Sequence, residues 1–208
     1  MQRQTCCRLV IGTALFCAFT LVSCVAQEVY QQEAGRLAVL LNWQPGSVVA
    51  EIGAGRGQIT LQAAELVRAT GRVYTTELDP KEFARLQEMA ADHKNITAIK
   101  AGEADTNLPP DCCDSIFMRL VYHHIVDPVE IDASLFRSLK PGGRLAVIDE
   151  EPRPGSSPVK GVPANRIGHG IPQKVLVAEL TAAGFQVVKI QNDWPGGKYC
   201  VVFSKPGA

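Results

Sequence analysis

The sequence lacks the clusters of lysine and arginine with which proteins usually recognise nucleic acid. It contains 21 basic and 21 acidic residues, so its formal net charge is zero, and no run of lysine and arginine interrupts this balance. Proteins that bind nucleic acid or anionic lipid through charge need such clusters. We therefore expect neither as an electrostatic partner, whereas a small polar or apolar substrate is compatible with the composition.

Cysteine is scarce outside the N-terminal region. Four of the seven cysteines lie before residue 25, which leaves Cys112, Cys113 and Cys200. A disulfide between the neighbours Cys112 and Cys113 would be strained, and the pairing of either with Cys200 stays open at this point. There is no Cys-x-x-Cys motif and no histidine-rich spacing, so the sequence predicts no metal site.

The first 27 residues are typical of an export signal. Two arginines and no acidic residue precede an almost wholly apolar stretch over 9–22. A positive segment, an apolar segment and small residues at the exit define such a signal. The exit reads Leu21-Val-Ser-Cys24, which resembles a bacterial lipoprotein box, so Cys24 would become the lipidated first residue.

Two alternatives to the lipoprotein remain for this segment. Cleavage after Ala26 fits nearly as well, and the apolar stretch approaches the roughly 20 residues that span a membrane as an uncleaved anchor. We expect an exported domain, periplasmic or lipid-anchored to the bacterial envelope, and a cytoplasmic one if the N-terminal segment is a misassigned start.

From residue 28 onward, helical and strand patterns alternate. Buried strands are predicted over 47–52, 72–78, 96–101, 114–120 and 144–149, and helices over 28–43, 58–69, from 79 onward and over 129–139. Such alternation predicts parallel strands with helices on both faces of one sheet. The chain has no internal repeat, and we expect a single domain over residues 28–208.

After the fifth predicted strand the alternation stops. Residues 151–172 are rich in proline, glycine and serine and are predicted to form a mobile loop over the strand ends. A helix over 173–183 and two strands over 185–191 and 199–204 follow. Because the connection between these strands is short enough for a hairpin, the last strand is predicted to run antiparallel to its neighbour.

A glycine-rich turn, EIGAGRG over 51–57, leads from the first predicted strand into the next helix. In open α/β sheets ligands bind beyond the carboxyl ends of the strands at such a point. A dinucleotide site requires the pattern Gly-x-Gly-x-x-Gly. Here the glycines lie at 53, 55 and 57, and Gln58 stands where the third spaced glycine belongs. The turn predicts a ligand but argues against a nicotinamide dinucleotide.

Acidic residues stand at the ends of three successive predicted strands. Glu51 ends a buried strand, where an unpaired carboxylate is costly and a cationic ligand group would offset that cost. Glu77 can accept hydrogen bonds from the hydroxyls of a ribose, and Glu103 can read an adenine amino group. No Gly-Lys-Ser/Thr motif is present to hold phosphate. An adenosine with a charged amino-acid tail and no phosphate is S-adenosylmethionine, which we expect as the cofactor.

These features together resemble the class I S-adenosylmethionine-dependent methyltransferases. More narrowly, they are similar to the small-molecule branch called methyltransferase type 11, which includes enzymes of ubiquinone and menaquinone biosynthesis. The resemblance covers residues 45–204. It rests on Glu51-x-Gly-x-Gly-x-Gly57, Glu77-x-Asp79-Pro80, Gly102-Glu-Ala104 ahead of Leu108-Pro109, Asp114-Ser-Ile, His123-His124-x-x-Asp127-Pro128 and Leu139-Lys-Pro-Gly-Gly143.

The resemblance implies an α/β, Rossmann-like sheet of seven mostly parallel strands in the order 3-2-1-4-5-7-6, with strand 7 antiparallel. Glu77 would bind the ribose, Leu78 would pack on the adenine, and Glu103 with Ala104 would contact the adenine edge. Because the family more often has aspartate at this position, Asp105 is an alternative. The methionine part would face Glu51, Gly53, Ala54, Gly55 and Gly57.

Arg119 is a departure from the family pattern, because many relatives have a small or neutral residue there. We include it in the predicted cofactor site. Its guanidinium could pair with Glu51 or Glu150, or it could bind an anionic acceptor.

Methyl transfer needs a base only when the acceptor must lose a proton. The candidates are His123, His124 and Glu150, with Glu151 and His169 as further possibilities. Histidines at a strand-to-helix junction also serve as packing and capping residues, so both interpretations stay open. Tyr122 could place its ring face near the sulfonium or fill the core.

Three hypotheses about function follow. The leading one is a methyltransferase, monomeric or dimeric, that acts on a small-molecule or lipid-like acceptor. The second is an exported module that binds S-adenosylmethionine or S-adenosylhomocysteine without catalysis, and the third is a nicotinamide-dependent oxidoreductase.

Overall fold

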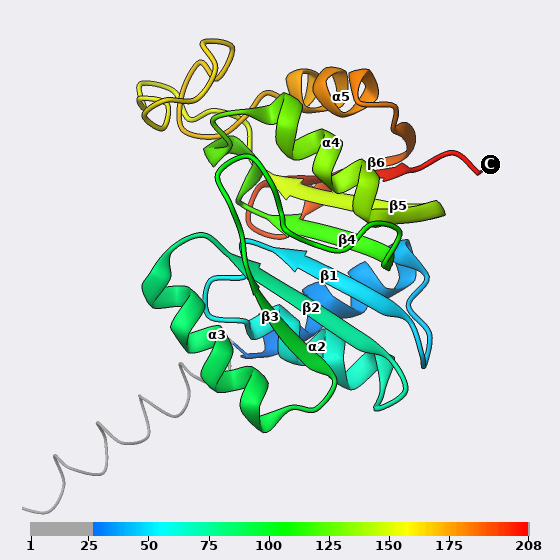
Figure 1. Ribbon diagram of the computed structural model, residues 1–208. Helices are drawn as coiled ribbons and strands as arrows, with labels where there is room; N and C mark the ends of the chain where they lie inside the picture. Colours follow the sequence, from blue (N-terminus) through cyan, green and yellow to red (C-terminus); the bar gives the residue numbers. More distant parts are fainter. Residues whose placement is uncertain (1–26, 208) are drawn as a thin grey trace, which may run out of the picture.

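The computed structural model describes residues 27–207. The predicted export signal, including Cys24, therefore lies outside the described residues apart from its last position. Seven strands form one sheet in the order β3-β2-β1-β4-β5-β7-β6 (Figure 1). The strands are β1 Val48–Ile52, β2 Arg72–Glu77, β3 Ile96–Lys100, β4 Cys113–Arg119, β5 Leu139–Asp149, β6 Gln186–Trp194 and β7 Lys198–Ser204. This is the predicted order, and the predicted fold class is confirmed.

Strand direction also follows the prediction. Neighbouring strands from β3 to β5 are parallel, whereas β7 is antiparallel to both β5 and β6. The hairpin is tighter than expected, because β6 continues to Trp194 and only residues 195–197 connect it to β7. Gly196 and Gly197 have φ angles of 77° and 73° there, which glycine adopts without steric cost.

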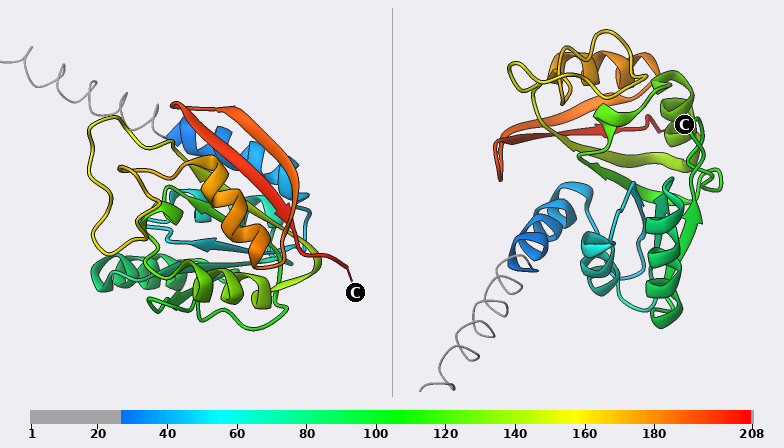
Figure 2. Two further views of the ribbon diagram at one scale, coloured as in Figure 1. Left: turned by 90° about the horizontal axis from the view of Figure 1, so that it is seen from above. Right: turned by 90° about the vertical axis from the view of Figure 1, so that its left-hand side faces the viewer.

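Helices cover both faces of the sheet (Figure 2). One face carries a helix over residues 27–41 and α2 (Gln58–Val67), packed against β-strand residues such as Val49 and Phe117. The other carries α4 (Pro128–Ser138) and α5 (Gln173–Ala182). The helix α3 (Pro80–Asp92) packs beside β2 and β3, and a short 3-10 helix, η1 (Tyr122–His124), follows β4.

Two helices begin at Asp-Pro pairs in the sequence. The Asp79 carboxylate accepts hydrogen bonds from the backbone N–H groups of Lys81 and Glu82, at 2.9 and 3.0 Å, and Pro80 opens α3. Asp127 caps α4 in the same way, ahead of Pro128. Such caps satisfy N–H groups that have no partner within the helix. These two caps fix the residues at which α3 begins after β2 and α4 begins after β4.

The start of β5 differs from the prediction. The strand was predicted over 144–149, but β5 begins at Leu139. The ladder with β4 shifts register between Cys113 and Ser115, and Gly142 has a φ of 78°. The Pro-Gly-Gly segment is therefore an irregularity within the strand, since Leu139 already pairs with Cys113.

The three cysteines within residues 27–207 are free. The Sγ atoms of Cys112 and Cys113 lie 2.8 Å apart without forming a disulfide. Cys113 packs in the core on the α4 face of the sheet, and Cys200 packs in the core on the α2 face. The sheet therefore separates these two thiols. In this part of the chain no helix combines the length and apolar character needed to cross a membrane.

Candidate active site

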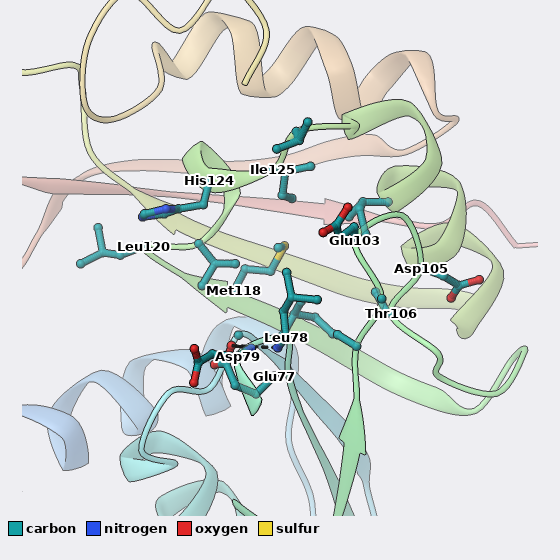
Figure 3. A pocket seen from close by; sticks show the side chains of 17 residues that line it. Glu77, Leu78, Asp79, Glu103, Asp105, Thr106, Met118, Leu120, His124 and Ile125 are labelled. Atoms are coloured by element: carbon teal, nitrogen blue, oxygen red, sulfur yellow. Dashed lines mark hydrogen bonds between the residues drawn. The ribbon is translucent and has the colours of Figure 1, made fainter. Parts of the chain in front are cut away.

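A cavity of about 520 Å³ lies at the carboxyl ends of β1, β2 and β4 (Figure 3). Its walls come from segments that directly follow strands, among them residues 52–53, 77–79, 101–103 and 120–121. Most of the lining is apolar, and a few acidic side chains interrupt it. A volume of this size and a sparse set of polar groups are typical of a small-molecule site.

The glycine-rich turn shapes one wall of the cavity. Gly53, Gly55 and Gly57 have φ angles of 66°, 55° and 72°, a region that side chains with a Cβ rarely adopt. A Cβ on Gly53 would lie 2.6 Å from Cγ2 of Val121, so glycine lets the ends of β1 and β4 approach. A Cβ on Gly55 would meet no atom within 4 Å. The turn thus has open space beside Gly55.

Glu77 links this turn to the end of β2. Its Oε2 accepts a hydrogen bond from the N–H of Gly55 at 2.8 Å, and its Oε1 accepts one from the N–H of Leu78 at 2.9 Å. An ionised carboxylate has about four acceptor positions, so further hydrogen bonds can be accepted on the cavity side. The predicted ribose-binding residue is held in place by the turn predicted to bind the methionine part.

Glu51 lies beneath the turn and does not line the cavity. Its side chain is buried, and its carboxylate accepts a hydrogen bond from the hydroxyl of Thr60 in α2. Burial raises the pKa of the Glu51 carboxyl to about 7, although hydrogen bonds from Thr60 and the charge of Arg119 oppose the rise. Glu51 therefore makes no direct contact with a molecule in the cavity, and any electrostatic effect on a bound cationic group would be exerted through the turn.

Arg119 contacts a carboxylate that the sequence did not suggest. Its guanidinium pairs with Glu33 of the helix over residues 27–41, and not with Glu51 or Glu150. The Glu33 side chain is almost fully buried, and the guanidinium also lies 5.6 Å from the centre of the Tyr30 ring. Arg119 does not line the cavity; its ion pair ties this helix to the end of β4.

The end of the cavity predicted to hold adenine contains Leu78 and Glu103. Leu78 is 47% exposed although it is apolar, as expected for a side chain that covers a ligand ring. The Asp105 carboxylate is occupied by hydrogen bonds from Ser134 at 2.9 Å and Arg137 at 2.8 Å, and it points away from Leu78 in Figure 3. Among these two acids, Glu103 is therefore the one available to a ligand; Ala104 does not line the cavity.

Three histidines meet beside this cavity. The rings of His123 and His124 lie 4.2 Å apart between their centres, and the ring of His169 lies 4.7 Å from that of His123. His124 lines the cavity. Burial lowers the pKa of His124, and the neighbouring His123 and His169 rings lower it further. The sequence predicted no metal site from local spacing, and this cluster is assembled from segments far apart in the chain.

Asp149 at the end of β5 orients His123. Its Oδ1 lies 2.7 Å from Nδ1 of His123, and its carboxylate also accepts the backbone N–H groups of His123 and Glu150. Both side chains of the pair are buried. Because an ionised carboxylate is an acceptor only, Nδ1 of His123 donates to it, and in the neutral ring the lone pair is then on Nε2.

Comparisons with known proteins agree with this geometry. Residues 50–147 match the family described as a methyltransferase domain. A protein-L-isoaspartate O-methyltransferase of Aeropyrum pernix is 31% identical over 118 residues, which cover 54% of this chain and 42% of that protein. A ubiquinone/menaquinone biosynthesis C-methyltransferase of Proteus mirabilis is 28% identical over 104 residues, or 49% of this chain and 41% of that protein. The chain spans less than half the length of either relative.

The crystal structure of an S-adenosylmethionine-dependent methyltransferase from Aquifex aeolicus has the same fold. It superposes with a TM-score of 0.69 at 20% identity and covers 83% of this chain and 89% of that one. Residues 50–147 therefore match a methyltransferase domain in sequence, and the sheet has the fold of the class I methyltransferases. The cofactor of this family is S-adenosylmethionine, as predicted, and the nicotinamide alternative is not favoured.

The other predicted bases contact groups outside the cavity. Glu150 Oε1 accepts a hydrogen bond from Nε of Arg153 at 3.0 Å. Partial burial alone would raise the pKa of Glu150, but Arg153 lowers it overall. Glu151 accepts the N–H of Gln173 at the start of α5, at 3.0 Å. Tyr122 is buried and donates a hydrogen bond to Asp132 at 2.8 Å, which favours the core interpretation.

Several residues that line the cavity were not predicted from the sequence. They are apolar and line the cavity together with His124: Met118, Leu120, Val121, Ile125, Val126 and Ile131. Leu120 has a φ of 56°, a strained value for a leucine of the kind found near functional sites. No sequence signal marks that angle. The available signal was the run of apolar residues around the histidine pair, which is equally typical of a core segment.

Proposed function

We propose that the protein transfers a methyl group from S-adenosylmethionine to a small-molecule or lipid-like acceptor. The observation that carries the proposal is the cavity at the ends of β1, β2 and β4, with Glu77 fixed between the glycine-rich turn and β2. It lies within the segment that matches the methyltransferase domain family.

The residues of the cavity fit the cofactor in chemistry and in order. Glu77 would accept the ribose hydroxyls, Leu78 would cover the adenine ring, and Glu103 would accept its amino group. The space beside Gly55 would hold the methionine part. When bound, S-adenosylmethionine supplies a methyl group on a positively charged sulfur.

The acceptor side is the apolar wall that contains Val121, Ile125 and Val126, with His124 at its edge. An apolar wall suits a small or lipid-like molecule. The lowered pKa of His124 keeps its ring neutral at neutral pH, so its lone pair can take a proton from an acceptor hydroxyl or thiol. The neighbouring His123, whose ring Asp149 orients, is buried and does not line the cavity, so His124 is the better placed of the two predicted bases.

Calorimetry on the full chain tests the proposal. We expect S-adenosylmethionine and S-adenosylhomocysteine both to bind, and Glu77→Ala to weaken binding by about 1–3 kcal/mol, the scale of lost charge-assisted hydrogen bonds. Glu88→Ala, on the exposed surface of α3, is the matched control. Absence of binding by either compound would refute the proposal. Binding without turnover over a broad panel of acceptors would instead favour a module without catalysis.

We also propose that the domain is exported and anchored through a lipid on Cys24. The support is the sequence alone: a basic segment, an apolar stretch and the Leu21-Val-Ser-Cys24 exit. Labelling cells with radioactive palmitate checks it, and we expect the wild-type chain to be labelled and Cys24→Ala to lose the label. Equal labelling of the two would exclude the anchor.

A further inference from the structure

The cluster of His123, His124 and His169 contains buried ring nitrogens without hydrogen-bond partners among the described residues, which a role in proton transfer does not require. Nε2 of His123 and Nδ1 of His169 are both buried, and neither makes a hydrogen bond with any group in residues 27–207. One nitrogen from each of His123, His124 and His169 lies within 4.8 Å of the other two. Because unpaired buried polar atoms are costly, a group that binds the nitrogens of His123 and His169 together would remove this cost.

The local structure fixes the histidines in this arrangement. His123 and His124 are consecutive in η1, directly after β4, and Asp149 holds the ring of the first. A carboxylate that accepts the second ring N–H of a histidine orients that ring for metal binding and raises its basicity. This supporting contact comes from β5 and is independent of the close approach of the rings.

The loop over 151–172 is shaped to bring His169 to the same place. Gly170 has a φ of 115°, and a Cβ there would lie 2.6 Å from the carbonyl oxygen of Glu150. The N–H of Ile171 donates to that carbonyl at 2.9 Å, and the N–H of Arg153 donates to the carbonyl of His169 at 3.1 Å. The loop was predicted to be mobile, yet around His169 its backbone pairs with the chain that follows β5.

We propose that His123, His124 and His169 bind a divalent transition-metal ion of the zinc class. Neutral imidazole nitrogens suit zinc, cobalt, nickel and copper. A tetrahedral zinc ion about 2.0–2.1 Å from each nitrogen places the nitrogens about 3.4 Å apart. The cluster must therefore contract through rotation of side chains, for which the exposed His124 and the half-buried His169 have more room than the buried His123. The carboxylate of Glu150, 3.8 Å from Nδ1 of His169, adds negative charge beside the ion.

Three protein ligands leave a position for another molecule, the arrangement found in catalytic rather than structural zinc sites. In Figure 3 His124 lies on the opposite side of Met118 from Glu77, the predicted ribose ligand. A metal ion there lowers the pKa of a bound hydroxyl or thiol and would take over the role of a base. This last step rests on the proposed function, whereas the metal site itself does not.

Metal binding to the full chain tests the proposal. The protein is purified with a tag that contains no histidine, stripped with a chelator and titrated with Zn²⁺ against a coloured competitor and with Co²⁺ by absorption. We expect one ion per chain and a cobalt spectrum typical of tetrahedral nitrogen and oxygen ligands. His93→Ala is the matched control. Of the four histidines of the sequence, His93 is the one outside the cluster, and it is exposed at the end of α3.

We expect His169→Ala to reduce the zinc affinity by at least about 100-fold and Asp149→Asn by about 10–100-fold, the range for a supporting partner, while His93→Ala leaves it unchanged. His169 lies in a loop, so its variant should fold; thermal unfolding checks the buried Asp149. The proposal is overturned by the absence of saturable binding, by equal affinity of His169→Ala and wild type, or by sulfur-to-cobalt charge transfer. The last result would place the ion at cysteine side chains and not at the histidines. Calorimetry with S-adenosylhomocysteine on the same preparations tests the proposed function separately.

Discussion

Replacing Glu51 by glutamine should change how the stability of the protein depends on pH. The carboxyl is buried and its pKa is raised from 4.5 to about 7, chiefly by burial. Because the folded state holds this proton more tightly than the unfolded state does, the free energy of unfolding falls as pH rises from about 4.5 through 7. Glutamine cannot ionise, but it keeps an oxygen that accepts the hydrogen bond from Thr60.

The size of the stability difference follows from the pKa shift of Glu51. At about 1.36 kcal/mol per pKa unit, a rise from 4.5 to about 7 costs the wild type about 3 kcal/mol once pH exceeds 7. About 2.5 kcal/mol of this loss falls between pH 5 and pH 8. Stability should be nearly equal in wild type and Glu51→Gln below pH 4.5, and the variant should be the more stable of the two at pH 8.

Urea unfolding at several pH values between 5 and 8 measures the difference. Other groups, including Asp132 with its pKa raised to about 7 by burial, titrate in both proteins and cancel in the comparison. Glu65→Gln, at an exposed position of α2, is the matched control and should follow the wild type. Parallel pH curves for wild type and Glu51→Gln would show that Glu51 ionises freely in the folded protein, and the reasoning from burial would be refuted.

Two substitutions of glycine should act in opposite directions. Gly35 lies in the helix over residues 27–41, and a Cβ there would meet no atom within 4 Å. Gly35→Ala should therefore raise the free energy of unfolding by about 0.5–1 kcal/mol. A melting temperature lower than that of the wild type would contradict this. Gly170→Ala should lower stability by about 1–3 kcal/mol, because its Cβ would lie 2.6 Å from the carbonyl oxygen of Glu150. Gly155→Ala, with a φ of 74° but open space around its Cβ, should cost less, and equal losses in the two variants would show that the close contact has no effect.

The parts of the fold that were predicted correctly depend on short-range signals. The Asp-Pro pairs at 79–80 and 127–128 supply both a cap and a fixed φ at the first turn of a helix. The short connection before β7 imposes the antiparallel hairpin. The strand order came through the family resemblance and not from the alternation itself, because alternating strands and helices are compatible with several orders of a parallel sheet.

The parts of the predicted site that lie together in the structure come from motifs at two neighbouring strand ends. The glycines at 53, 55 and 57 and Glu77 lie within two adjacent strand ends, and the structure places them together around Gly55. Side chains with several possible partners were not predictable in this way. Arg119 pairs with Glu33, which is 86 residues away in the sequence, and Asp105 is occupied by Arg137.

The amino-acid sequence by itself therefore determined the strands and helices, the hairpin and the glycine-rich turn, because local φ preferences, caps and hydrophobic periodicity act over a few residues. Only the tertiary structure decided which distant side chains share a space. It buried Glu51 behind the turn, placed Cys113 and Cys200 on opposite faces of the sheet, and brought His169 from its loop to His123 and His124. Such contacts depend on how strand ends and loops pack against one another, and residue spacing along the chain carries no record of that packing.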